Sequence, residues 1–192
     1  MPTPDRTSLD DIVRAARDLL ESEGLSRLSM QAVADRVGVR APSLYKRVRN
    51  RDDLVRLVAE ATVADLTQRL DSVAHATPGD VRLRLPQLAR ALRTFAHEQP
   101  AGYRLVFSPE TAATTASAET VALAVEPLLT VVAELAGPDD ALNAARTVTA
   151  WATGFIAMEL AGAFQLGGNL DSAFEFGITR LVAALAARSP LG

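Results

Sequence analysis

The chain has 192 residues and a net charge of -3, and 48% of its residues are apolar, so it is long and apolar enough to form a globular core. It contains no cysteine, which excludes disulfides and thiolate chemistry. The most apolar stretch, residues 121–136, is interrupted by Glu126, Pro127 and Glu134, and the N-terminus lacks a basic region followed by an apolar run. We therefore expect a cytoplasmic protein with no membrane partner.

A first helix is expected to begin after Ser8. Ser8 can cap this helix, and Asp11 stands three residues later, where it can form the reciprocal bond. Gly24 marks the end of the helix. Its apolar residues lie on one stripe and are Ile12, Ala16, Leu19 and Leu20.

Two short helices joined by a tight turn are expected next. Ser29 can cap a helix over residues 30–37, and Gly38 stands where a helix ends in a left-handed residue. A second helix is expected over residues 41–47, with Pro42 in its first turn, where no internal hydrogen bond is lost. Two such helices form a helix-turn-helix. The second would be about 10 Å long, which fits a major groove about 12 Å wide.

The same stretch carries a local excess of positive charge. Between residues 36 and 51 there are six basic residues and no acidic one, although the whole chain is net negative. Such a cluster on an acidic protein favours contact with a polyanion. The alternative is a solvated basic face that binds nothing, and for Arg47 and Arg49 solvation is as well supported as contact.

The rest of the chain predicts further helices and no strands. Asn50 can cap a long helix that runs past Leu70 and links the N-terminal head to the remainder. Further helices are expected over residues 80–97, 103–107, 118–136, 139–165 and 170–188, with Pro127 kinking or dividing the third of these. We therefore expect an all-α fold. Residues 1–50 would form a three-helix helix-turn-helix domain, and residues 51–192 a helical effector-binding and dimerisation domain.

The head resembles a known family. Over about residues 8–60 the chain is similar to the TetR-type (TetR/AcrR) transcriptional regulators, and the matching residues are Ala34, Val37, Gly38, Val39, the run Ser43–Lys46 and the run Asn50–Leu54. The resemblance implies a ligand-responsive bacterial regulator, with a repressor the favoured form. It would bind a palindromic operator in double-stranded DNA as a homodimer and be released by a small molecule.

Two positions of the head depart from the family pattern. Arg40 stands where Ser or Thr is common, and Val48 stands where Phe is common. Further along the chain, residues 151–164 are similar to a TetR subgroup with a Trp-His-Gly pattern, but Thr153 stands where that subgroup often has His.

The candidate DNA-binding residues lie at helix starts and along the second short helix. The resemblance makes Tyr45 and Lys46 phosphate ligands, and their phenol and ammonium donors permit this, although Tyr45 buried in the core is the alternative. Arg40 opens the helix at the end that reaches base edges, where arginine can bind guanine. Ser29 and Arg51, at helix starts, would hold the DNA backbone. The full set is Ser29, Arg40, Ala41, Pro42, Ser43, Tyr45, Lys46 and Arg51.

The last two helices carry complementary stripes that suggest a homodimer interface. Small residues permit close approach, and large residues on the next helix can fill the seam. In the family, the last two long helices of each subunit form a four-helix interface; packing within the subunit is the alternative. The small residues are Ala150, Gly154, Ala157 and Ala161, and the large ones are Phe174, Ile178, Leu181 and Leu185.

Bulky side chains of the second domain are candidates for a pocket that binds an apolar or aromatic effector. Aromatic residues at helical spacing also form ordinary core, and that alternative stays open for each of them. The candidates are Phe95, Tyr103, Phe107, Trp151, Phe155, Met158 and Glu159.

An enzyme and a helical interaction module are the competing classes. Neither His75 nor His97 stands in a metal-binding spacing, and no nucleophile elbow, phosphate loop or dinucleotide fingerprint is present. We therefore expect no catalytic residue, metal or cofactor. A pure interaction module would leave the basic cluster unexplained, whereas DNA retention that falls steeply with salt separates a regulator from both alternatives.

Overall fold

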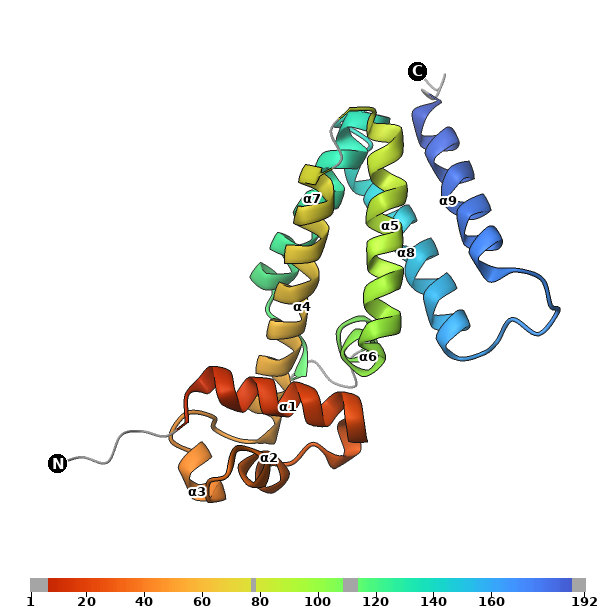
Figure 1. Ribbon diagram of the computed structural model, residues 1–192. Helices are drawn as coiled ribbons and strands as arrows, with labels where there is room; N and C mark the ends of the chain where they lie inside the picture. Colours follow the sequence, from red (N-terminus) through yellow and green to blue (C-terminus); the bar gives the residue numbers. More distant parts are fainter. Residues whose placement is uncertain (1–6, 77–78, 109–113, 188–192) are drawn as a thin grey trace. The chain divides into compact units, whose positions relative to one another are not determined.

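The computed structural model describes residues 7–76, 79–108 and 114–187, and the regular elements in these ranges are all helices, which confirms the all-α prediction (Figure 1). In chain order they are α1 (Leu9–Glu23), the 3-10 helix η1 (Leu25–Arg27), α2 (Met30–Val37), α3 (Ala41–Leu44), α4 (Arg51–Ala76), α5 (Val81–Glu98), α6 (Pro100–Phe107), α7 (Ala118–Ala136), α8 (Ala141–Leu160) and α9 (Leu170–Ala186).

The chain divides into two compact units. Unit 1 comprises Met1–Asp65 with Gln99–Val121, and unit 2 comprises Leu66–Glu98 with Ala122–Gly192. Helices α4 and α7 therefore each contribute to both units. The boundary placed at residue 50 from sequence follows the helix-turn-helix motif. The compact units divide the chain differently, because unit 1 also contains the start of α4 and all of α6. The boundary at residue 50 between a DNA-binding part and an effector-binding part therefore stays a prediction.

Unit 1 begins with the expected capped helix. The Asp11 N–H donates to Ser8 Oγ at 3.0 Å, and the Ser8 N–H donates to Asp11 Oδ2 at 3.1 Å. This reciprocal pair satisfies two of the donors that a helix start leaves open. The predicted apolar stripe of α1 is buried, and α1 packs against α2 and α6.

Side chains of α1 hold the start of α6 within unit 1. The two carboxylate oxygens of Glu21 accept the N–H groups of Ala101 at 3.1 Å and Gly102 at 2.6 Å. Arg17 donates to Asp65 and to Gln99, each at 2.7 Å. A carboxylate at a helix N-terminus is favoured by the open N–H groups and by the helix dipole, so polar contacts help to hold α6 against α1.

Unit 2 is built on α5, α8 and α9, which pack on one another (Figure 1). Its core includes the fully buried Phe95, Ile156, Phe174 and Ile178. Ion pairs close the edge of the core. Arg90 of α5 binds Glu175 of α9 through two hydrogen bonds of 2.6 and 2.5 Å, and Arg93 of α5 binds Glu159 of α8 in the same two-pronged way.

Several helix boundaries differ from the predicted ones. Helix α3 ends at Leu44, and residues 45–47 continue as a turn. Pro127 lies inside an undivided α7, and Pro86, which received no role from the sequence, lies inside α5. Pro100 begins α6, because proline is tolerated in the first helical turn. The last helix, expected to reach residue 188, ends at Ala186, because the backbone is extended at Ala187.

Among the residues that the structure describes, no single helix is long and apolar enough to cross a membrane; α7 and α8 meet the length and composition test only as a pair bent by 117°.

Candidate DNA-binding surface and effector region

The helix-turn-helix forms from the expected signals. The Ala32 N–H donates to Ser29 Oγ at 3.2 Å, which caps α2. Gly38 ends α2 with φ 77°, a left-handed conformation that a side chain would strain, and its N–H returns to α2 carbonyls. The turn places α3 against α2 (Figure 1).

One side of α3 and its following turn is anchored in the core of unit 1. Leu44 and Val48 have no exposed surface. The N–H groups of Arg47 and Val48 both donate to the Leu44 carbonyl at 2.9 Å, so the backbone turns tightly after α3. Val48 is therefore a core residue, although it is smaller than the phenylalanine common in the family.

The other side of this segment faces solvent. Tyr45 is 54% exposed, which argues against the alternative of a buried tyrosine. The remaining predicted contact residues on this face are half-buried Ala41 and exposed Arg40, Pro42, Ser43 and Lys46. Arg36, Arg47 and Arg49 are also exposed. The segment therefore presents a basic surface to solvent, while its buried residues Leu44 and Val48 fix it to the core.

Arg51 is used differently from the sequence expectation. Its Nε donates to the Leu28 carbonyl and one terminal nitrogen donates to the Leu25 carbonyl, both at 2.7 Å. The guanidinium therefore links the start of α4 to the η1 turn of the same unit. These bonds use two of the five guanidinium donors, so we propose that Arg51 chiefly holds the helix-turn-helix together, and its contact with a DNA phosphate stays a prediction.

The start of α4 is fixed by a further set of bonds. The Asp53 N–H donates to Asn50 Oδ1 at 2.8 Å, as expected for a capping residue. The reciprocal bond is shifted by one residue, because Asp53 accepts the Arg49 N–H at 2.9 Å instead of that of Asn50. This backbone bond, aided by Arg56, lowers the pKa of Asp53. Asp53 therefore stays ionised while it fixes the turn that precedes α4.

The predicted effector residues belong to two separate groups. Tyr103 and Phe107 lie on α6 in unit 1, with ring centroids 4.7 Å apart, and burial raises the pKa of Tyr103 to about 12. The others lie in unit 2. Among them Phe95 has no exposed surface and the Arg69 guanidinium lies 5.2 Å from its ring centroid, which fits a core position.

Trp151 belongs to an aromatic cluster in unit 2 in which Phe155 contacts the other three rings, that of Phe174 at 5.3 Å. The Trp151 ring centroid is 5.1 Å from that of Phe174 and 6.0 Å from that of Phe155, and Phe155 also contacts Phe164 at 4.9 Å. Trp151 packs so closely on α9 that a Cβ added at Gly177 would stand 2.3 Å from Trp151 Cζ2. The sequence did not indicate the role of Gly177.

Met158 and Glu159, which were grouped with the aromatic residues, have different surroundings. Met158 is 47% exposed. The carboxylate of Glu159 is bound by Arg93, and His97 Nε2 lies 3.2 Å from Glu159 Oε2. The hydrogen bonds from Arg93 are the main cause of the lowered pKa of Glu159. This carboxylate is thus committed to a contact between α5 and α8.

The two stripes predicted for a dimer seam differ in exposure. The small residues Ala150, Gly154, Ala157 and Ala161 are exposed along α8. Phe174 and Ile178 have no exposed surface in the single chain, so they have no area left to bury against a partner. We therefore move these two from the seam to the subunit core. Leu181 and Leu185 are half-buried, and Phe176 is 64% exposed.

Two family models match the chain. Residues 5–58 match the model described as bacterial regulatory proteins, tetR family. Residues 85–181, half of the chain, match the model described as tetracyclin repressor-like, C-terminal domain.

The chain belongs to the TetR family. Its sequence is 32% identical over 100 residues to an uncharacterised HTH-type transcriptional regulator of Mycobacterium tuberculosis, a match that covers 52% of this chain and 45% of that protein. It is 41% identical over 59 residues to the class E tetracycline repressor protein of Escherichia coli, covering 31% and 28% of the two chains. The matches thus span less than half the length of these curated relatives.

Solved structures of the family share the fold over nearly the whole chain. A TetR variant from Acinetobacter baumannii AYE, crystallised in complex with minocycline, has a TM-score of 0.69 and 25% identity, and the match covers 93% of this chain and 96% of that chain. Membership of the Trp-His-Gly subgroup stays a prediction, because the C-terminal model that matches carries a different description.

Proposed function

We propose that this TetR-family protein is a transcriptional regulator, in the first instance a repressor, that binds a palindromic DNA operator as a homodimer and is released by a small molecule. The proposal that the protein binds DNA rests on one observation: a single short segment has some side chains buried in the core and others exposed to solvent. Leu44 and Val48 are fully buried, while Arg40, Tyr45 and Lys46 on the same turn are exposed. A rigid anchor with outward donors holds those donors at a fixed spacing, as groove recognition requires.

The exposed residues would divide the work of recognition. Lys46 and Tyr45 donate to phosphate oxygens, which supplies affinity that does not depend on sequence. Arg40, with Pro42 and Ser43 beside it, reaches base edges, where an arginine can make two bonds to guanine. Ser29 keeps its hydroxyl hydrogen available for a phosphate while its oxygen caps α2.

DNA binding is tested by selecting sites from a random double-stranded library with the full chain. We expect the selected duplexes to contain a palindrome with half-sites about 34 Å apart or a multiple of that distance. Lys46→Ala should weaken binding to every duplex. Arg14→Ala, at a residue whose side chain is 71% exposed on α1, is the matched control and should bind like the wild type. Equal retention of all library sequences would contradict operator recognition.

The homodimer would form on the exposed stripe of α8 and the neighbouring face of α9. Small residues let two copies approach closely, and the exposed Phe176, with the half-buried Leu181, supplies apolar area. Ala157→Arg places a charge in this seam and should shift the protein from dimer to monomer in sedimentation velocity. Ala64→Arg, at an exposed position of α4, is the control. If the Ala157→Arg protein stays a dimer, as the control is expected to do, the interface does not lie on this stripe.

The aromatic cluster around Trp151 is the proposed effector region, and the TetR relative crystallised with minocycline supports the binding of a small molecule by a protein of this fold. An effector releases DNA only if it binds the DNA-free form more tightly, and a coupling of about 1–3 kcal/mol corresponds to roughly 5–150-fold release. We expect an apolar or aromatic effector to change the fluorescence of Trp151, the single tryptophan. A compound that releases DNA and leaves this fluorescence unchanged would place the effector elsewhere.

A further inference from the structure

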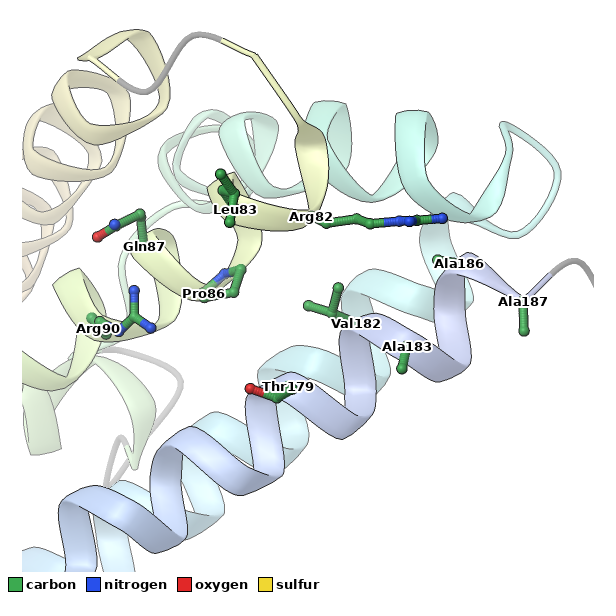
Figure 2. A pocket seen from close by; sticks show the side chains of 10 residues that line it. All are labelled: Arg82, Leu83, Pro86, Gln87, Arg90, Thr179, Val182, Ala183, Ala186 and Ala187. Atoms are coloured by element: carbon green, nitrogen blue, oxygen red, sulfur yellow. The ribbon is translucent and has the colours of Figure 1, made fainter.

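A groove lies between the first half of α5 and the second half of α9 in unit 2 (Figure 2). Its volume is about 620 Å³, within the range of about 300–1,000 Å³ typical of small-molecule sites. Pro86 and Val182 face each other across it, and Arg82 extends from the start of α5 toward the last turn of α9.

The groove stays open because of the residues on its α9 wall. Near the middle of α5, Arg90 and Glu175 bridge the two helices with a two-pronged ion pair. Beyond this pair α9 offers Ala183, Ala186 and Ala187, whose side chains are too short to fill the space toward α5. Pro86 lies opposite and presents its apolar ring; lacking an N–H, it cannot donate to the carbonyl of Arg82 four residues earlier.

The charge of the groove is positive at one end. Its lining contains two arginines and no carboxylate. Arg90 is already matched by Glu175, and this pairing raises the pKa of the arginine and lowers that of the glutamate. Arg82 is exposed, and its N–H donates to Asp80 Oδ1 at 2.9 Å. Among the described residues its guanidinium has no ion-pair partner, so it stands as a cation at one end of the groove.

We propose that this groove binds an elongated apolar molecule that carries one carboxylate. The apolar body lies between Pro86 and Val182, and the carboxylate pairs with the Arg82 guanidinium, which presents two parallel donors. Arg82 and Arg90 are eight residues apart on α5, or about 12 Å at 1.5 Å per residue. That length suits a two-ring aromatic acid. The site is separate from the Trp151 cluster, which lies against α9 at Gly177 on the side of α8.

The test is a calorimetric titration of the full chain with two probes of one shape, biphenyl-4-carboxylate and the neutral biphenyl-4-methanol. The wild type should bind the carboxylate at least roughly tenfold more tightly, which is what one charge-assisted hydrogen bond supplies. Arg82→Gln should remove that preference and leave alcohol binding unchanged. Ala183→Phe should fill the groove and weaken both probes. Arg146→Gln, at an exposed arginine of α8 outside the groove, should bind both probes like the wild type.

Several results would overturn the proposal. They are no binding of either probe, a carboxylate preference that survives in Arg82→Gln, or full binding by a folded Ala183→Phe. If Ala183→Phe changes the sedimentation coefficient while probe binding is intact, a second copy covers the groove and the proposal fails. If Ala183→Phe does not fold, the loss or survival of the carboxylate preference in Arg82→Gln is the deciding result. Since binding is measured without DNA, failure here leaves the proposed DNA binding untouched.

Discussion

Replacing Arg51 separates a residue that holds the fold from one that holds DNA. In Arg51→Ala, two bonds of 2.7 Å to the Leu25 and Leu28 carbonyls are lost. Hydrogen bonds to a charged group contribute about 1.5–3 kcal/mol each, and less where water can replace the donor, as it can at a half-buried side chain. We therefore expect Arg51→Ala to lower the free energy of unfolding by about 2–3 kcal/mol. With a slope of about 2–3 kcal/mol per molar urea, the midpoint falls by about 1 M.

The assay combines urea unfolding, followed by circular dichroism, with DNA binding at several salt concentrations. Arg51→Ala should be destabilised and, where it is folded, should keep the wild-type salt slope. Lys46→Ala should keep the wild-type stability and lose about one unit of slope per subunit. Arg49→Ala is the stability control, because its side chain is 85% exposed. An Arg51→Ala protein of full stability and reduced slope would show Arg51 to be chiefly a phosphate ligand and refute this reasoning.

Three further changes have defined outcomes. Arg40→Ala should cost about 1–3 kcal/mol on the selected operator and relax the base preference at one position, as measured by competition among operator variants. Gly177→Ala brings a Cβ to 2.3 Å from Trp151, so despite a helix-propensity gain of about 1 kcal/mol it should lower the unfolding midpoint and shift the tryptophan emission. Because Arg93 lowers the pKa of Glu159 from its ordinary value of 4.5, the stabilisation from this pair is complete above pH 4.5 and is lost as pH falls through the lower pKa of the folded state. Glu159→Gln should therefore be less stable by about 1–3 kcal/mol at pH 7 and should lose less stability below pH 4.5 than the wild type does.

The features that sequence predicted well are local ones. Ser8, Ser29 and Asn50 each cap the expected helix, because a cap depends on residues three positions apart. Gly38 adopts the left-handed conformation expected at a helix end. Leu44 and Val48 also follow a local pattern, since residues four apart lie on one face of a helical turn.

The features that sequence missed depend on partners far along the chain. The two acceptors of Arg51 are backbone carbonyls 23 and 26 residues away, and a carbonyl has no signature in the sequence. Glu21 reaches N–H groups about 80 residues away. Phe174 and Phe176 are equally apolar, but only the packing of α9 makes the first fully buried and leaves the second 64% exposed. Periodicity shows that a helix has faces without showing which neighbour covers each.

The most direct test of the central claim is the salt dependence of binding between the wild-type protein and its selected duplex. Each subunit presents Arg40, Lys46, Arg47 and Arg49 at the basic surface. If two to four of these contact phosphates in each half of a homodimer, the logarithm of the association constant should fall with the logarithm of salt concentration at a slope of about -4 to -7. A slope near zero, or no retention of any duplex at low salt, would contradict DNA binding by this surface.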